Sequence, residues 1–221
     1  MAYKKSEETR KKILEISRTL FAEKGFYGTE LKEIAKAAGM AHTGVYYYFK
    51  RKEDIASELY TLKTDEILSM VDSFREREGV TPLYLCILHY VLMMEELAFN
   101  PVTADCFFDM VNYRTYDRKE LARVRESYYV TLEQLFQSCQ VQMSENEMNI
   151  YILTSDAYAK ALLSALKSGV IEYTATEAVD HFFRHLLLPD LGISYDTYQA
   201  CRKQVLADLV KEGVPLTRFQ E

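Results

Sequence analysis

Apolar residues recur at helical spacing along this chain, and capping signals separate the helices. Thr81-Pro82 is one such signal, because proline is tolerated in the first turn of a helix. The stretches SENE and TATE, which begin at residues 144 and 174, have capping-box spacing. Helices are expected at about 6–24, 30–38, 42–49, 52–77, 81–98, 102–113, 117–142, 144–168, 174–189 and 194–211, and no segment has the alternation of a strand. The sequence therefore predicts an all-α fold of about nine or ten helices. Ser6 is expected to cap the first helix and Gly25 to end it.

Charge is distributed unevenly along the 221 residues. The net charge is −6, yet residues 1–54 carry 12 Lys and Arg against 8 Asp and Glu, whereas residues 55–221 carry 15 against 25. A basic N-terminal quarter on an acidic body predicts two domains with different tasks. Residues 1–54 would hold three short helices, and residues 55–221 a larger helical bundle. No apolar run is long enough to span a membrane, and no signal peptide is evident.

Motifs for catalysis and for cofactors are missing from the sequence. We see no nucleophile–base pair, phosphate loop or cofactor fingerprint, so neither an enzyme nor a cofactor is expected. His181 and His185 have a spacing able to hold a metal, but no HExxH glutamate lies between them and no Cys or acidic cluster is near in sequence. We interpret them as interface or surface histidines and expect no metal site. The four cysteines are far apart, which favours free thiols in a reducing cytoplasm.

Residues 45–52 read VYYYFKRK, an aromatic cluster that runs into three basic residues. Val45 and Phe49 lie four apart, so they share a helical face that can pack on the preceding helices. Tyr46 and Tyr47 are rotated about 100° and 200° from Val45, so at least one of them must face solvent beside the lysines. An exposed tyrosine hydroxyl can donate to a phosphate oxygen. The alternative is that the tyrosines are core residues and the lysines a solvated helix end.

The two short helices at 30–38 and 42–49 are joined by AAGMA, a turn with a glycine, and have the length of a helix-turn-helix. Further matching stretches are FAEKGF at 21–26, Thr29, IAKAAGM at 34–40 and VYYYFKRKED at 45–54. On these residues the N-terminal part resembles the DNA-binding domain of the TetR family of bacterial repressors. The remainder of the chain matches that family only in being helical and of suitable length.

The resemblance implies DNA contacts for nine residues. Base reading would fall to His42, Thr43 and Gly44 at the start of the recognition helix. The others would contact phosphates or brace the motif: Thr29, which would also cap the second helix, Tyr46, Tyr47, Tyr48, Lys50 and Lys52.

The chain departs from the family pattern at the start of the recognition helix. Ala41 replaces the usual serine, so the helix loses its normal N-cap and is expected to start one turn late, at Thr43. Thr43-Gly44 reverses the usual order and places a glycine inside a short helix, at a cost of about 1 kcal/mol relative to alanine. His42 replaces a commoner basic residue. The operator sequence therefore cannot be inferred from relatives.

The resemblance also implies a homodimer, in which each subunit supplies one recognition helix. Residues 145–168 carry a stripe of small side chains that would let two backbones approach, and residues 175–188 supply further apolar ones. The expected interface comprises Ala157, Ala161, Ser164, Ala165, Phe182 and Leu186. The alternative is tight packing within one subunit.

Aromatic and methionine side chains are frequent between residues 81 and 142, which suits an apolar pocket for a small-molecule effector. The expected lining comprises Tyr84, His89, Met93, Phe107, Met110, Tyr113 and Tyr128. His89 could anchor a polar group of the effector. For each of these residues, the alternative is plain core.

The leading hypothesis is a cytoplasmic, homodimeric DNA-binding repressor. It would bind a palindromic or pseudo-palindromic operator and be released by a small molecule through a shift of populations. Two other classes stay open. One is a protein–protein adaptor that has lost DNA binding, which the departures at Ala41 and Thr43-Gly44 motivate; the other is a helical enzyme with a vestigial helix-turn-helix.

Overall fold

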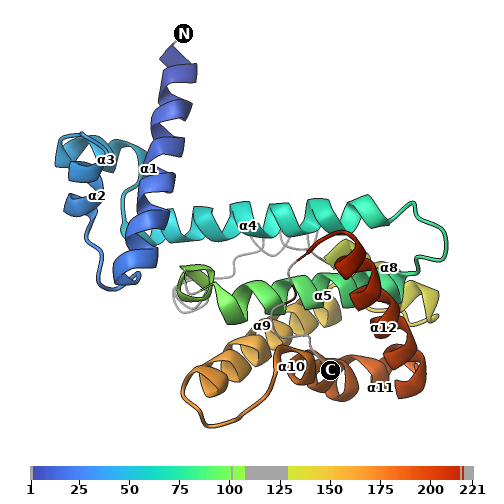
Figure 1. Cartoon of the computed structure of the whole chain (residues 1–221). Helices are drawn as coiled ribbons and strands as arrows, with labels where there is room; N and C mark the ends of the chain where they lie inside the picture. The colour runs from blue at the N-terminus through green and yellow to red at the C-terminus, as the bar shows by residue number, and fades with distance from the viewer. Residues whose placement is uncertain (1, 101, 108–128, 215, 217–221) are drawn as a thin grey trace. The chain divides into compact units, whose positions relative to one another are not determined.

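The structure is a computed structural model that describes residues 2–100, 102–107, 129–214 and 216. Every regular element in these residues is a helix, as the periodicity predicted (Figure 1). The helices are α1 (Ala2–Lys24), α2 (Leu31–Ala37), α3 (His42–Tyr48), α4 (Lys52–Phe74), α5 (Pro82–Phe99), α8 (Val130–Ser138), α9 (Glu145–Lys167), α10 (Ala175–Phe182), the π-helical turn η2 (Phe183–Leu187), α11 (Leu188–Leu191) and α12 (Tyr195–Lys211). Residues 102–107 are also helical. The predicted all-α fold is confirmed.

The chain forms two compact units. The first comprises residues 1–64 and 99–114, and the second comprises residues 65–98 and 115–221. The sequence placed a boundary at residue 54, near the start of α4, whereas this long helix contributes residues to both units. In the described residues, no helix combines the length and the apolar character that crossing a lipid bilayer requires.

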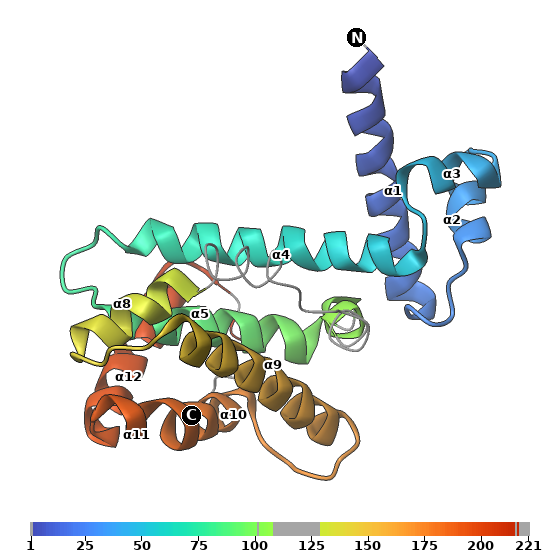
Figure 2. The same cartoon turned by 180° about the vertical axis from the view of Figure 1, so that it is seen from behind.

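One apolar cluster holds the first unit together. Ile13 and Phe21 of α1, Ile34 of α2 and Val45 of α3 are at most 2% exposed and belong to the same cluster. Cys106 joins them from a segment much later in the chain. Both views of the molecule show α1, α2 and α3 gathered side by side (Figures 1 and 2). Because the three helices share this core, the position of α3 is set by the fold and not by the helix alone.

The ends of the N-terminal helices differ in part from expectation. Gly25 adopts a φ of 75° and ends α1, as predicted. The expected N-cap at Ser6 is wrong, since α1 begins at Ala2 and no glycine or proline interrupts it before Ser6. The delayed start of α3 is also wrong, because the helix begins at His42. Ala41 provides no side-chain cap, but its carbonyl accepts the Gly44 N–H at 2.8 Å, so the backbone closes the first turn.

Capping chemistry sets the helix starts of the second unit. The Ser144 hydroxyl accepts the Glu147 N–H and the Glu147 carboxylate accepts the Ser144 N–H, so the predicted capping box of α9 is confirmed. The TATE stretch forms the same box at the start of α10. Thr81 accepts the Tyr84 N–H at 3.2 Å and thereby opens α5.

Three predicted helix ends are wrong. The helix α4 ends at Phe74, and α8 ends at Ser138, shortly before Gln140 adopts a φ of 60°. Pro189 does not end the helix that begins at Ala175, since it lies in the first turn of α11, where its missing N–H forfeits no hydrogen bond. Gly192, with a φ of 63°, ends α11 instead.

The four cysteines are free, as expected. Parts of the helices predicted at 102–113 and 117–142 lie outside the described residues.

Candidate nucleic-acid interface

The short helix α3 divides into a buried face and an exposed face. Val45 and Phe49 are 0% and 1% exposed in the core of the first unit, whereas Tyr46 and Tyr47 are 38% and 75% exposed. His42 is also exposed, at the first position of the helix. The predicted division of the cluster between core and solvent is confirmed. The buried pair fixes α3, and the exposed side chains are left for a partner.

Aromatic contacts order the exposed face. The His42 ring meets the Tyr46 ring edge to face, with centroids 4.9 Å apart and an interplanar angle of 84°. Tyr47 meets Tyr48 in the same way at 5.1 Å. Tyr48 is half-buried and packs against the core cluster, so it braces the motif while Tyr47 projects. An edge-to-face pair limits the rotamers of its members, which lowers the entropy lost when they bind.

The structure corrects the assignment of Thr29. Its side chain is 1% exposed, and its hydroxyl lies 2.9 Å from the Gly25 carbonyl and 3.2 Å from the Leu20 carbonyl. It therefore closes the C-terminal end of α1, where carbonyls lack helical partners. The N-cap of α2 is Glu30, whose N–H donates to the Glu33 carboxylate at 3.1 Å. The prediction that Thr29 caps the second helix is wrong, and its buried hydroxyl has no surface from which to reach a phosphate.

The two predicted phosphate-binding lysines occupy different environments. The Lys52 ammonium donates to the Phe26 carbonyl at 2.6 Å and to the Thr29 carbonyl at 2.9 Å, and it lies 4.2 Å from the centre of the Phe26 ring. It thus braces the turn between α1 and α2. Lys50 is exposed, and its ammonium donates to the Tyr46 carbonyl at 2.9 Å, near the end of α3. Lys50 is therefore the better placed of the two for a phosphate.

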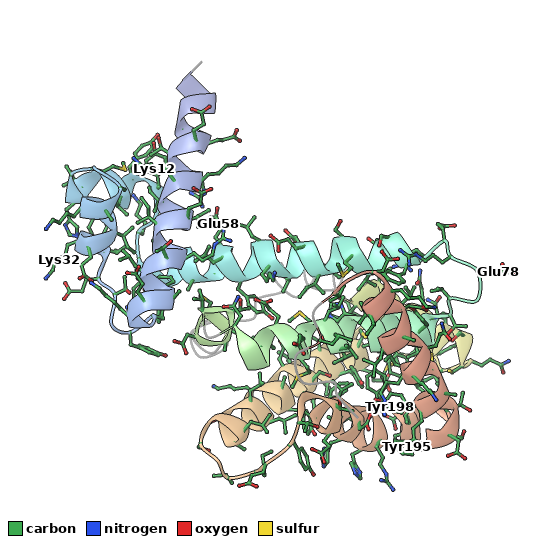
Figure 3. All side chains as sticks on the ribbon, viewed as in Figure 1. Lys12, Lys32, Glu58, Glu78, Tyr195 and Tyr198 are labelled. Atoms are coloured by element: carbon green, nitrogen blue, oxygen red, sulfur yellow. The ribbon has the colours of Figure 1, made fainter. Side chains whose placement is uncertain are left out.

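Arg10 and Lys12 are positioning residues that the sequence did not reveal. The Arg10 guanidinium donates to the Glu58 carboxylate and, at 3.1 Å, to the Tyr48 carbonyl at the end of α3. It also lies 4.3 Å from the centre of the Phe49 ring. Lys12 donates to the Ala38 carbonyl at 2.9 Å and so closes α2; Figure 3 marks Lys12 and Glu58. In the sequence, Arg10 and Lys12 look like ordinary solvent-exposed residues of a helix. Their structural role is shown only by their contacts in the folded chain.

Ion pairs take up part of the basic charge. Lys24 contacts Glu33 at 2.7 Å, a hydrogen bond that raises the pKa of Lys24 and lowers the pKa of Glu33. Lys32, marked in Figure 3, contacts Glu30 at 2.6 Å, and Arg51 contacts Asp54 at 3.0 Å. Lys24, Lys32 and Arg51 are each paired with a carboxylate, so they add less net positive charge to the first unit than the sequence count suggests.

The predicted effector-pocket residues divide between the two units. Tyr84, His89 and Met93 are buried in the second unit. Burial, then the neighbouring Asp208 that accepts the Tyr84 hydroxyl at 3.0 Å, raises the pKa of Tyr84. Phe107 belongs to the first unit, where its ring lies 5.6 Å from that of Tyr60. The structure therefore does not gather these residues within one unit. Met110, Tyr113 and Tyr128 lie outside the described residues.

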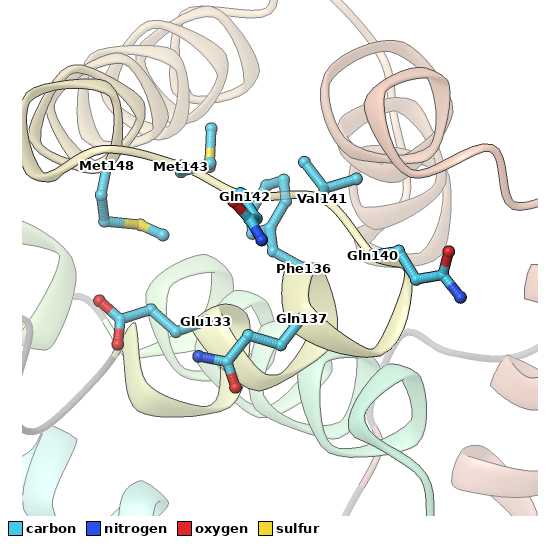
Figure 4. Close-up of a pocket in the computed structure, with 8 residues that line it drawn as sticks. All are labelled: Glu133, Phe136, Gln137, Gln140, Val141, Gln142, Met143 and Met148. Carbon is cyan, nitrogen blue, oxygen red and sulfur yellow. The ribbon is translucent and has the colours of Figure 1, made fainter.

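A cavity of about 700 Å³ lies where α8 gives way to the loop before α9 (Figure 4). Amide groups, two methionines and one carboxylate line it, and among the predicted pocket residues that the structure describes, none does so. The lining consists of Glu133, Phe136, Gln137, Gln140, Val141, Gln142, Met143 and Met148. No sequence pattern indicated it, because it depends on the left-handed turn at Gln140.

The predicted interface residues also differ in exposure. Ala157, Ala161 and Ser164 are exposed along α9, whereas Ala165 and Leu186 are half-buried. Phe182 is 5% exposed, and its ring lies 4.4 Å from that of Tyr90. As a core residue of the second unit, Phe182 is not free to meet another subunit, which corrects its assignment.

The geometry of α2 and α3 defines the class of the protein. A turn that contains a glycine joins α2 to the exposed helix α3, and both helices pack on α1. This arrangement is that of a helix-turn-helix DNA-binding domain. The profile described as "Bacterial regulatory proteins, tetR family" matches residues 13–59. Over these residues the chain carries the DNA-binding domain of the TetR family of bacterial regulatory proteins.

Relatives with curated descriptions match only part of the chain. The chain is 42% identical over 62 residues to the HTH-type transcriptional regulator AcrR of Shigella flexneri, a match that takes in 28% of this chain and 29% of that one. It is 29% identical over 87 residues to the negative transcriptional regulator IcaR of Staphylococcus aureus, across 38% of this chain and 47% of the relative. The chain thus matches less than half of the length of either protein.

A solved structure shares the fold over nearly the whole chain. The crystal structure of RolR in complex with resorcinol superposes with a TM-score of 0.64 and 14% sequence identity, covering 91% of this chain and 96% of that chain. At this identity the likeness establishes the fold of the chain.

Proposed function

We propose that this chain is a transcriptional repressor that binds a palindromic or pseudo-palindromic DNA operator as a homodimer and leaves it when a small molecule binds. The observation that carries the proposal is the exposed edge of α3, with His42 and Tyr46 paired at its start and Tyr47 projecting beside Lys50. In a helix-turn-helix the second helix enters the major groove and its first residues meet base edges. The protein would act in the cytoplasm at the nucleoid, as a regulator and not as an enzyme.

Division of labour within α3 follows from this geometry. His42 and Thr43 occupy the first turn and would read bases, with Gly44 allowing a close approach of the backbone. Tyr46, Tyr47 and Lys50 would hold phosphates, which supplies affinity without sequence preference. Tyr48 and Lys52 would keep the motif in place, given the contacts described above.

The dimer is supported by the outer face of α9. Ile150 and Leu153 are 63% and 38% exposed, and Ala157, Ala161 and Ser164 continue the same stripe at helical spacing. Exposed apolar side chains in one line suit a second helix, and the small residues would let the two helices approach closely. Two copies would present two recognition helices to successive major grooves.

Repression is favoured by the description of IcaR as a negative regulator. A small-molecule effector is favoured by the second unit, which offers both a buried aromatic core and the cavity of about 700 Å³ before α9. An effector would act by favouring a dimer whose recognition helices no longer fit two grooves, with a coupling of about 1–3 kcal/mol.

Fluorescence anisotropy with the gene's own upstream DNA and a random duplex tests the proposal. We expect tight, salt-dependent binding to the upstream DNA. Tyr47→Ala should weaken binding to both duplexes alike, whereas His42→Ala should lower the preference for the upstream DNA. Equal losses on both duplexes for His42→Ala would refute its role in base reading. No complex at low salt with an intact dimer would overturn DNA binding and favour a protein–protein adaptor.

A further inference from the structure

Two histidine side chains lie together at the end of α10. The rings of His181 and His185 have centroids 4.5 Å apart and an interplanar angle of 46°. His181 is half-buried and His185 is exposed, so an ion from solvent can reach the pair. Zinc binds imidazole nitrogen at about 2.0–2.1 Å, and neighbouring rings at this separation can direct one nitrogen each to a shared ion.

Tyr158 of α9 holds one nitrogen of the pair. Its hydroxyl forms a hydrogen bond with Nδ1 of His181, and the two rings are stacked with an angle of 10°. If Nδ1–H donates to the tyrosine oxygen, the lone pair of Nε2 is left for a ligand. Metal-binding histidines are commonly fixed by such an oxygen partner on the other ring nitrogen, which sets both tautomer and ring orientation.

A second aromatic ring lies beside the pair. Tyr173, from the loop before α10, places its ring 5.8 Å from that of His181, with an interplanar angle of 44°.

The backbone between the two histidines changes from α-helical to π-helical. The π-helical turn covers Phe183–Leu187 and therefore includes His185 but not His181. Turns of this kind inside α-helices are rare and are found often at functional sites. Here the turn alters the angle between two side chains that a regular helix would hold one turn apart.

We propose that His181 and His185 bind one divalent transition-metal ion of the kind that prefers imidazole, such as Zn²⁺, Ni²⁺ or Cu²⁺, with Nε2 of His181 as a ligand and Tyr158 as its positioning residue. Among the described residues no three His, Cys, Asp or Glu side chains gather for a metal, so water completes the coordination and the site is open. The sequence argued against a metal here because the HExxH glutamate is missing. The proposal is independent of DNA binding.

Copper(II) titration of the purified, tag-free full chain tests the site, because a histidine tag would compete for the ion. The chain has 4 histidines, so variants assign the ligands fully. We expect one Cu²⁺ per chain by calorimetry, with nitrogen hyperfine splitting from two imidazoles in the electron paramagnetic resonance spectrum. His181→Ala and His185→Ala should each weaken binding at least about tenfold.

His42→Gln, which alters an exposed histidine of the first unit, is the matched control and should bind as the parent chain does. Circular dichroism and thermal melts without metal verify that each variant folds. Tyr158→Phe should weaken binding about tenfold and shift the tautomer of His181 seen by ¹⁵N NMR. The site would be overturned if the His181→Ala/His185→Ala double variant bound Cu²⁺ as tightly as the parent chain. It would also be overturned if the parent chain bound no more Cu²⁺ than the double variant. Unchanged affinity and tautomer in Tyr158→Phe would remove its positioning role.

Discussion

At the scale of single residues, Lys50 and Lys52 show how two similar side chains acquire different tasks. Lys52 donates to two backbone carbonyls and lies over the Phe26 ring, whereas Lys50 is exposed beside the tyrosines. A family pattern assigns both to phosphates, because it records residue types and not their partners. The contacts separate a bracing lysine from an exposed one, for which we propose a phosphate contact.

Methionine substitutions at the two positions test this difference. Lys52→Met should lower the free energy of unfolding by about 1–3 kcal/mol, because the Phe26 and Thr29 carbonyls lose their donor. Lys50→Met should change stability by less than about 0.5 kcal/mol and reduce the slope of log K against log salt by about 0.9 for each phosphate that the variant no longer neutralises. Urea unfolding and anisotropy at several salt concentrations measure both. Equal stability of the two variants would contradict the bracing role of Lys52.

His89 predicts an acid-sensitive second unit. Burial lowers its pKa to about 3, against 6.5 for an ordinary histidine. As pH falls below 6.5, the unfolded chain binds a proton that the folded chain refuses, so folding stability falls until pH approaches 3. Between pH 7 and pH 5 this residue should account for a loss of about 2 kcal/mol.

Urea unfolding at both pH values measures the effect. His89→Gln should lose about 2 kcal/mol less than the parent chain over this interval, whatever its stability at pH 7. The exposed His42→Gln variant serves as the control and should keep the parent's pH dependence. The same pH dependence in His89→Gln and the parent would show that His89 takes up its proton in the folded state.

At the scale of elements, α3 carries a glycine that its conformation does not need. The structure gives Gly44 no left-handed backbone, and a Cβ there would meet only the Met40 side chain, with its methyl group nearest at 3.2 Å. That methyl ends a flexible side chain and can move. Gly39, in the turn before α3, has a φ of 69° that side chains disfavour.

Alanine at the two glycines should therefore act in opposite directions. Gly44→Ala should stabilise the chain by up to about 1 kcal/mol, because glycine is the poorer helix former. Gly39→Ala should destabilise it by about 1 kcal/mol, since alanine is strained in a left-handed conformation. Thermal and urea unfolding check both. If Gly44→Ala binds DNA less well although it is more stable, the glycine serves close approach to DNA.

Elements were predictable where local chemistry decides them. Gly25 and the Ser144 capping box follow from spacing alone, because neighbours in sequence supply every group involved. Helical periodicity likewise predicts which residues of α3 share its buried face. Thr29 and Arg10 were not predictable in this way. Thr29 donates to carbonyls 4 and 9 residues earlier, at the end of α1, and Arg10 contacts Glu58, 48 residues later, so the folded first unit is needed to reveal both roles. Pro189 does not end the helical segment, because it lies in the first turn of α11, directly after the π-helical turn.

At the scale of the whole molecule, the proposed dimer rests on the exposed face of α9. Ala161→Glu places a charge in the middle of the exposed small-residue stripe. If the stripe of one subunit packs against the same stripe of the other, the two introduced carboxylates face each other without a positive charge nearby. The dimer should then weaken at least about tenfold. Sedimentation at several concentrations, together with anisotropy on the upstream DNA, measures the loss of both dimer and operator binding.

Ala200→Glu is the matched control, since Ala200 is also an exposed alanine on a helix, α12. It should sediment and bind DNA as the parent chain does. A dimer of unchanged strength in Ala161→Glu would place the interface elsewhere on the second unit.

The anchoring of α3 by Val45 and Phe49 has an evolutionary consequence. Side chains that secure the helix and side chains that face outward are different residues, and the Arg10 contacts act only at the end of the helix far from His42. Mutations at positions 42 and 43 therefore change a solvent-facing surface at little cost in stability. A lineage that duplicates this gene could redirect one copy to a new promoter by substitutions at these two positions while the scaffold stays intact.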